Sequence, residues 1–357
     1  MGVISNTPRP GYVWDSADNV WYPIGVGAHQ HTNAADTPAV MPYSTYAAAG
    51  KNKFLNGDFS IWQRGTSFTG AGVYTADRWY YMTNGSATVS RQTFTPGTAP
   101  VSGYEGQYFM RVARDAGGVY TQVSQKIEDV RTFAGQTVTL SFWAKADSSI
   151  AITPYWNQGF GSGGSSDVGA ALTDITLTTS WTRYSRTFTL PSIAGKTIGA
   201  NNLLEIYTAR YVGSAAVTID IWGVQLEAGS TVTAFQTATG NPASELAACQ
   251  RYYWRFTNTT VNPSYLGVGT YYSATSCYIV LQWPVQMRVA PSIATSSQTG
   301  WLTQAGSQRN STAFGVDVAS TNYADVYVTT SSHTVGIGAI VGLLGSSNHW
   351  VEASAEL

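Results

Sequence analysis

The sequence is poor in charged residues and has no long hydrophobic run. Only 11% of its 357 residues are Asp, Glu, Lys or Arg, and 19 basic against 20 acidic residues give a net charge of -1. Nucleic acids and anionic membrane surfaces bind clustered basic residues, so this balance argues against both partners. No apolar run reaches the roughly 18 residues of a membrane-spanning helix, and we expect no membrane insertion.

Cysteine is also scarce, and the motifs of common enzymes are missing. The two cysteines, Cys249 and Cys277, are too few for a disulfide framework or a thiolate metal site, so we predict that both are small buried residues. Residues 1–10 lack the charged-then-apolar layout of a secretory signal, which predicts synthesis in a cytosol. No Gly-x-Ser-x-Gly, Walker or His-Glu-x-x-His motif occurs and the acids are scattered, so we expect no enzyme.

What the sequence does contain favours β-structure. Aromatic residues make up 13% of the chain and there are 36 glycines. Apolar residues alternate with polar ones in segments such as 138–144 and 217–221, and turn residues recur between these segments. A period of two is typical of half-buried strands. The sequence therefore predicts an all-β protein whose main domain is a jelly-roll β-sandwich.

We divide the chain into three parts. Residues 1–50 form a short extended N-terminal arm with one strand pair around 12–14 and 20–23; residues 51–238 form the jelly-roll domain; residues 239–357 form a linking helix and a second, smaller β-sandwich. We expect the helix within 239–254, started by Asn241 and Pro242 and capped by Ser244. Four tryptophans, Trp62, Trp79, Trp143 and Trp222, are assigned to the core.

Several runs resemble bacteriophage tail fibre and minor tail proteins. They are FLNGDFSIWQRGTSF at 54–68, YTADRW at 74–79, WGVQLEAGS at 222–230, ELAACQRYY at 245–253 and PVQMRVAP at 284–291. The central part also resembles jelly-roll carbohydrate-binding modules, through NGDF at 56–59, SFWAK at 141–145 and Asp220. Within the first motif group, Asp77-Arg78-Trp79 is interpreted as a turn with a local ion pair above a packed indole.

The resemblance implies a role as well as a fold. It implies a non-enzymatic tail fibre or receptor-binding subunit of the virion, assembled as a homotrimer, attached to other tail or baseplate proteins through the N-terminal arm and adhering to a host surface glycan. Two alternatives stay open: a structural decoration or spacer protein without a ligand, and a glycan-degrading tailspike.

The candidate glycan site is Tyr155-Trp156-Asn157-Gln158, which precedes a glycine-rich loop at 159–169. Aromatic faces stack on pyranose rings, and amide groups bond to sugar hydroxyls. This pairing of residue types makes the segment the predicted carbohydrate-binding residues.

Two candidate metal sites accompany it, although no cofactor is required. In a parallel trimer, His29 and His31 from three chains would place six imidazoles on the three-fold axis, a set that suits iron. Asp58 and Asp220 correspond to positions where jelly-roll carbohydrate-binding modules hold structural calcium. The alternatives are solvated linker histidines for the first pair, and a turn and a strand-end hydrogen bond for the second.

Overall fold

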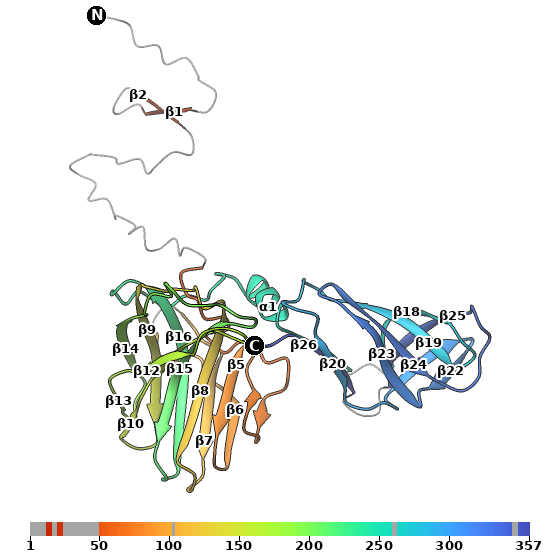
Figure 1. Cartoon of the computed structure of the whole chain (residues 1–357), viewed down its shortest axis with the longest axis horizontal. Helices are drawn as coiled ribbons and strands as arrows, with labels where there is room; N and C mark the ends of the chain where they lie inside the picture. The colour runs from red at the N-terminus through yellow and green to blue at the C-terminus, as the bar shows by residue number, and fades with distance from the viewer. Residues whose placement is uncertain (1–11, 16–19, 24–49, 102–103, 259–262, 345–348) are drawn as a thin grey trace, which may run out of the picture. The chain divides into compact units, whose positions relative to one another are not determined.

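A computed structural model describes residues 12–15, 20–23, 50–101, 104–258, 263–344 and 349–357 (Figure 1). Its contacts divide the chain after Tyr46, so the residues before that point are described by themselves. They contain the antiparallel pair β1 (Tyr12–Asp15) and β2 (Val20–Pro23), which confirms the predicted hairpin. Ala47–Leu357 form one compact unit.

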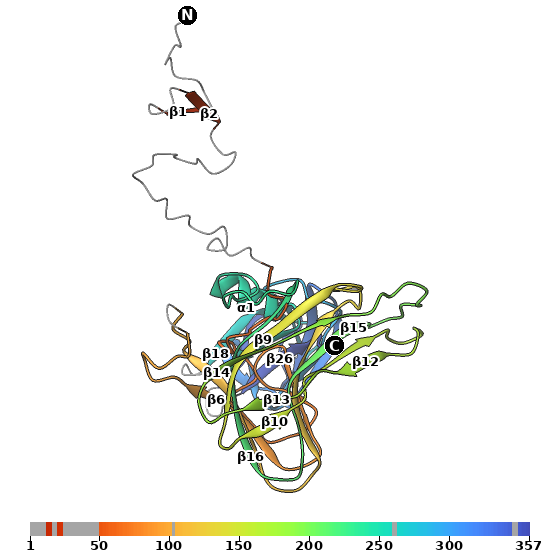
Figure 2. The same ribbon diagram turned by 90° about the vertical axis from the view of Figure 1, so that its left-hand side faces the viewer.

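Two six-stranded antiparallel sheets make up the sandwich in the described part of this unit (Figures 1 and 2). Sheet I has the order β12 (Val168–Ala171), β11 (Tyr155–Gly159), β15 (Leu203–Val212), β8 (Tyr120–Glu128), β5 (Trp79–Thr83) and β4 (Val73–Tyr74). Sheet II has the order β14 (Thr182–Thr189), β9 (Thr137–Ala146), β16 (Val217–Ala228), β7 (Tyr108–Arg114), β6 (Ala87–Thr93) and β3 (Ser67–Phe68). A further short pair joins β10 (Ile150–Ile152) to β13 (Ile175–Leu177).

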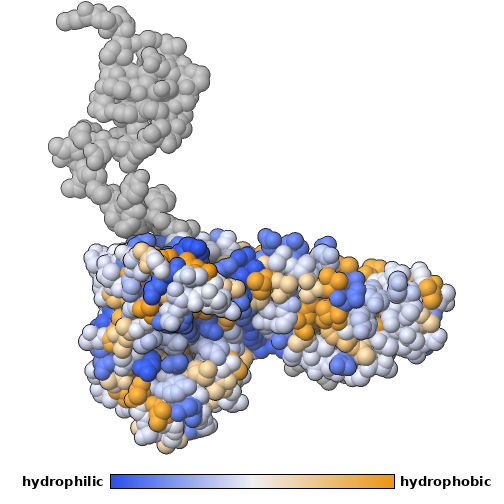
Figure 3. Space-filling view, in the orientation of Figure 1, coloured by the Kyte–Doolittle hydropathy of each residue, from blue (hydrophilic) through white to orange (hydrophobic). Residues whose placement is uncertain are grey.

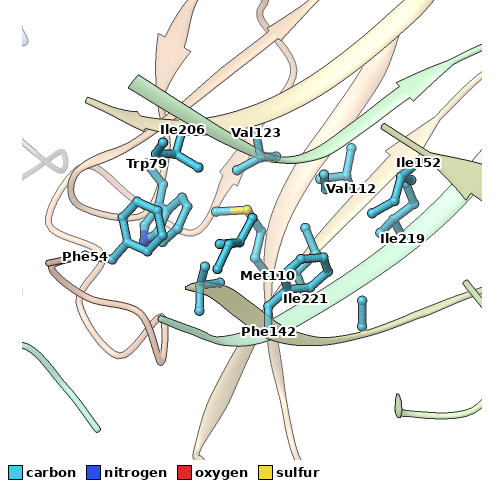
Figure 4. Packing of buried hydrophobic residues seen from close by; sticks show 14 of the residues in the cluster. Phe54, Trp79, Met110, Val112, Val123, Phe142, Ile152, Ile206, Ile219 and Ile221 are labelled. Atoms are coloured by element: carbon cyan, nitrogen blue, oxygen red, sulfur yellow. The ribbon is translucent and has the colours of Figure 1, made fainter. Parts of the chain in front are cut away.

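The predicted alternation builds the core between the two sheets. Side chains from both sheets point toward each other, among them Trp79, Val123 and Ile206 of Sheet I and Phe142 and Ile221 of Sheet II (Figure 4). None of the five is more than 1% exposed. Burial of their apolar area is the main driving force for pairing the sheets. The four tryptophans assigned to the core are all at most 9% exposed, which confirms that assignment.

A second, smaller aromatic cluster lies outside the main core. It contains Trp143, Trp222, Phe94, Phe109 and Phe235. The neighbouring Asn56-Gly57 turn is fixed to this region, because Val224 N donates a hydrogen bond to Gly57 O at 2.8 Å. A Cβ at residue 57 would lie 2.3 Å from Val224 O, so only glycine fits this approach.

Helix α1 (Pro242–Gln250) follows the sandwich as predicted, but its cap differs. Asn241 has extended φ and ψ, and its side chain accepts a hydrogen bond from Ser244 N at 2.9 Å. Asn241 is therefore the N-cap, and Ser244 lies inside the first turn. The helix ends before Tyr253, which begins strand β17.

After α1 the described residues form two more antiparallel sheets. The three-stranded sheet has the order β17 (Tyr253–Thr257), β26 (Trp350–Ser354) and β20 (Ser292–Thr295). The curled seven-stranded sheet has the order β22 (Ser307–Asn310), β21 (Trp301–Ala305), β25 (Gly338–Leu343), β18 (Ser264–Tyr271), β19 (Ser276–Gln282), β24 (Tyr323–Thr329) and β23 (Ala313–Ala319).

These two sheets share a core that includes Trp301, Val326 and Val351. The all-β class with one linking helix is confirmed, and the C-terminal part is built around the curled sheet. The three-part division, with boundaries after residues 50 and 238, stays a prediction. Within the described ranges, no helix has the length and apolar character needed to cross a membrane.

Candidate functional site

The predicted glycan segment lies on β11, and strand alternation splits it between two faces. Trp156 is 6% exposed and packs in the sandwich core. Gln158 is 1% exposed, and its amide donates to Pro191 O at 3.1 Å. Tyr155 and Asn157 are half-buried on the opposite, outer face of Sheet I. The structure thus leaves only these two of the four residues at the surface of the sheet.

The register of Sheet I places three further tyrosines in one row with Tyr155. Tyr155 pairs with Tyr207, Tyr207 with Ser124, Ser124 with Tyr80, and Tyr80 with Tyr74. Paired residues share a face, so one row crosses five strands from β11 to β4. We call this row of four tyrosines, together with Ser124, the tyrosine face. Adjacent rings are in contact: the centroids of Tyr155 and Tyr207 are 5.7 Å apart and those of Tyr74 and Tyr80 are 5.2 Å apart.

A buried carboxylate lies beside the middle of the tyrosine face. Glu205 is only 7% exposed although it is on the outer side of β15. Ser124 Oγ donates to its Oε1 at 2.7 Å, and Tyr207 Oη donates to its Oε2 at 2.8 Å. Burial and the nearby Glu205 charge raise the pKa of Tyr207, so its hydroxyl stays a donor at neutral pH. Both oxygens of Glu205 are therefore held in fixed positions.

Lys126 brings the balancing cation to the same row of residues as Glu205. It pairs with Glu205 across β8 and β15, while Asn157 pairs with Glu205 from the other side. The Lys126 ammonium lies 4.5 Å from the Tyr80 ring centroid. Burial lowers the pKa of Lys126, and the Arg78 charge acts in the same direction while Glu205 opposes both. The cation is thus partly desolvated against an aromatic ring.

A glycine and an arginine frame the β11 end of the tyrosine face. A Cβ at Gly169, on edge strand β12, would lie 2.6 Å from Tyr155 Oη, so the missing side chain allows that ring to lie against β12. The Arg210 guanidinium carbon is 5.9 Å from the Tyr155 ring centroid. Asn157 Nδ2 donates to Asp167 Oδ2 at 3.3 Å. The result is a surface with aromatic rings, two carboxylates, an amide and two cations.

The proposed calcium ligands already have protein partners. Arg111 Nε and Nη2 donate to the two oxygens of Asp220 at 2.7 and 2.9 Å, and Lys145 Nζ is 3.6 Å from it. Asp58 accepts hydrogen bonds from Ser60 and from Tyr104 Oη. Within the described ranges, no three His, Cys, Asp or Glu residues gather in a group that suits a metal ion. His29 and His31 lie outside the described residues.

The Asp77-Arg78-Trp79 turn has a different role from a local ion pair. Asp77 is fully buried and accepts hydrogen bonds from the Gln63 backbone and side chain, and burial raises its pKa. Arg78 forms its ion pair with Glu356, far along the chain. Trp79 packs in the core as expected, and its indole donates to Asn56 O at 2.9 Å. The motif therefore fixes a long-range contact between the sandwich and the C-terminal segment.

Known proteins resemble this chain in structure but not in sequence. No family model matches the chain, and no curated protein matches it. Among solved structures, the chain is similar to the enzymatically active domain of tailspike protein 4 of Bacteriophage CBA120, with 16% identity and a TM-score of 0.32 over 50% of this chain. The chain spans only 22% of that tailspike structure.

Two carbohydrate-binding modules of Clostridium thermocellum are similar to the same degree. The C-terminal family 22 module of Xyn10B has 17% identity and a TM-score of 0.34, covering 52% of this chain and 99% of the module. A family 11 module in complex with a mixed-linked β-1,3-1,4 tetrasaccharide has 14% identity and a TM-score of 0.30, covering 45% and 95%. These similarities are distant, and they do not assign the chain to a family.

Proposed function

We propose that this protein binds glycans at the tyrosine face without chemically altering them. The observation that carries the proposal is the row of four tyrosines on the outer face of Sheet I, with the desolvated Glu205 beside its middle. Tyrosine rings offer flat apolar faces that stack on the C–H faces of pyranoses. Carboxylate, amide and ammonium groups in the adjacent row match sugar hydroxyls, which both donate and accept hydrogen bonds.

The polar groups of this surface are pre-organised. Ser124 and Tyr207 hold Glu205, and Tyr80 lies under the Lys126 ammonium. Groups already fixed before binding lose little conformational entropy when the ligand arrives. Each aromatic side chain also has few rotatable bonds, so an ordered stack of rings costs little to form.

The neighbours of Glu205 support binding over hydrolysis. Glycoside hydrolysis uses two carboxyl groups that flank one bond. The residues paired with Glu205 on its two sides are Asn157 and Lys126, neither of which is an acid. The second carboxylate of this surface, Asp167, accepts hydrogen bonds from Asn157 Nδ2 and Phe160 N. A glycan on this row would meet Glu205 between an amide and an ammonium, which is a set of hydrogen-bonding groups for recognition.

The test is a glycan array followed by titration calorimetry on four variants. We expect Tyr155→Ala and Tyr207→Ala each to weaken binding about tenfold or more, since burying one aromatic side chain contributes about 1.5 kcal/mol or more. Tyr207→Phe keeps the ring and removes only the bond to Glu205, so its loss is smaller. Tyr272→Ala is the matched control, because that side chain is 79% exposed on the C-terminal part. Equal affinities for all variants, or no bound glycan, would contradict the proposal.

We further infer that the chain is a tail fibre or receptor-binding subunit of a phage virion, and that it works as a homotrimer. The tail-protein resemblance of the runs at 54–79 and 222–253 supports the first point. Exposed apolar side chains on the curled sheet support self-association: Val268, Val280 and Ile340 are 75, 54 and 42% exposed. Hydrophobic residues gather on the visible surface of this part in Figure 3. Large exposed apolar surfaces mark interaction sites.

Native mass spectrometry checks the assembly, and antibody labelling of virions in electron micrographs checks the location. A single-subunit mass would exclude the trimer. In a trimeric fibre the N-terminal arm would attach to tail or baseplate proteins and the tyrosine face would meet the host surface glycan. Release of soluble sugar from host cell-wall material would instead favour a glycan-degrading tailspike, and binding to no glycan would favour a structural decoration or spacer protein.

A further inference from the structure

One end of the tyrosine face is occupied by the protein's own backbone. Tyr74 Oη donates to Leu357 O at 2.8 Å, and Lys126 Nζ donates to the same oxygen at 2.9 Å. Glu356, the preceding residue, pairs with Arg78 and, at 3.0 Å, with Arg64. The segment 355–357, which follows β26, therefore lies against the β4 side of Sheet I. The hydroxyl donor of Tyr74 is thus taken up by Leu357 O, while the Lys126 ammonium, which has three donors, can still bond a ligand.

Buried ion pairs hold this segment in place. The side chains of Arg78, Glu356 and Arg64 are 2, 6 and 11% exposed. The Arg78 and Arg64 guanidinium carbons lie 3.5 Å and 3.4 Å from the ring centroids of Tyr252 and Tyr253. A ligand that pushed the segment away would leave two buried guanidinium groups without their carboxylate, which is strongly unfavourable. Residues 355–357 are thus held in place and are not displaced by a ligand; we call this segment the wall.

Backbone hydrogen bonds add to the wall. Arg288 Nε donates to Ala355 O at 2.8 Å and its Nη2 donates to Glu356 O at 3.0 Å. Ala355 N donates to Tyr252 O at 2.8 Å. Each of the three residues from 355 to 357 is therefore bonded through its backbone to a partner outside the segment, and the wall keeps its position without help from a ligand.

The other end of the tyrosine face has no such wall among the described residues. Edge strand β12 lies beyond Tyr155, and its residues next to that ring are Gly169, Ala170 and Ala171. All three are small and exposed. A glycan lying on the rings leaves freely over β12, but at the β4 side it meets Leu357. The tyrosine face is therefore bounded by Leu357 at its β4 end, and among the described residues it has no such boundary at its β12 end.

We propose that the tyrosine face recognises the terminus of a glycan chain, with the last sugar unit against Tyr80 and Leu357 and the remainder of the chain leaving over β12. This inference rests on the proposed glycan-binding function. It follows from the position of Leu357, because an internal segment of a polysaccharide would need to continue through the space that this residue fills at the β4 end.

Stoichiometry tests the proposal. The probes are β-1,4-linked gluco-, galacto- and N-acetylglucosamine oligosaccharides, each as short and as long chains, titrated by calorimetry into the full-length protein and the variant that lacks Leu357. For the wild type we expect each oligosaccharide, short or long, to bind one protein molecule. Removing Leu357 frees Tyr74 and Lys126 and opens the β4 end, so we expect several proteins per long chain and about 2- to 10-fold tighter binding to long chains. A thermal melt confirms that the variant is folded.

The outcomes separate the two proposals. Several wild-type proteins on each long chain would overturn recognition of a terminus and leave glycan binding intact. The proposal would also be overturned if the variant that lacks Leu357 still bound each long oligosaccharide with one protein molecule. Leu357 would then not be the residue that blocks the β4 end. Binding to none of the probes and to nothing on the array would overturn the glycan-binding function itself.

Discussion

Replacing Glu356 by alanine should strongly destabilise the protein. The Glu356 carboxylate lies between Arg64 and Arg78, and all three side chains are nearly buried. Burial lowers the pKa of both arginines, as expected for cations that have lost most of their hydration. In Glu356→Ala, two desolvated guanidinium groups lose the carboxylate with which both form an ion pair, although the buried Asp77 still acts on them. Removing one partner of a buried pair costs about 3–5 kcal/mol.

Urea denaturation followed by tryptophan fluorescence measures this loss as a lower free energy of unfolding of the Ala47–Leu357 unit. The matched control is Arg131→Ala, which breaks the Arg131–Asp129 pair at 3.2 Å, where the side chains are 60 and 44% exposed. Exposed pairs contribute about 0–1 kcal/mol. Added salt should change the wild type little, because buried pairs are weakly screened. A loss below about 1 kcal/mol for Glu356→Ala, similar to the control, would refute the argument that these charges are buried and mutually dependent.

Three further predictions concern other parts of the unit. The Cβ of Gly169→Ala would lie 2.6 Å from Tyr155 Oη and 2.7 Å from Trp156 O, so this variant should displace both the ring and the β11 backbone, weaken glycan binding several-fold in calorimetry and lower the melting temperature; unchanged affinity would show that the ring position is not critical. Burial raises the Cys277 thiol pKa from 9.0 to about 11, so its stabilising contribution is complete below about pH 9 and is lost as pH rises through about 11. Accordingly, a thiol-specific disulfide reagent at pH 8 should modify Cys277 only after unfolding, and rapid labelling of native protein would contradict this. Asn241→Ala removes the cap bond to Ser244 and should lower the free energy of unfolding by about 1 kcal/mol, measured in urea; no change would argue against the cap.

The fold was largely predictable from the sequence because its strands obey a simple alternation. In segment 138–144 every second residue, from Val138 to Ala144, joins the main core, and this pattern is local; the residues between them are buried as well, on the other face of Sheet II, which the alternation did not predict. The burial of Cys249 and Cys277 was predictable for a different reason: nothing in the sequence offered either thiol a partner, and both are free and buried. The helix was found, but its cap was assigned three residues late because Asn and Ser are both good caps.

The candidate site was only partly predictable. Tyr155 and Asn157 were identified, but Tyr74, Tyr80 and Tyr207 were not, because they join the site through the pairing of strands that are far apart in sequence. A signal was present in β15, where Leu204 and Ile206 alternate with Glu205 and Tyr207. An acid and an aromatic on the outer side of one strand point to a functional face, but the register that brings Ser124 and Lys126 beside them is a property of the folded sheet.

The few charged residues of this chain include several that make internal contacts and do not contribute to the surface. Several of them are buried and fix contacts between distant segments. Glu245 is 1% exposed, and it accepts a hydrogen bond from Asn56 N at 2.6 Å, 189 residues away. Glu227, at 0% exposed, accepts hydrogen bonds from Gln225 and Thr233 and pairs with Lys51. Because charged residues are few and several are buried, hydroxyl, amide and aromatic groups make up much of the surface. Such a surface would suit the proposed glycan ligand, because fixed exposed charges would add a desolvation cost to binding an uncharged polyhydroxylated molecule.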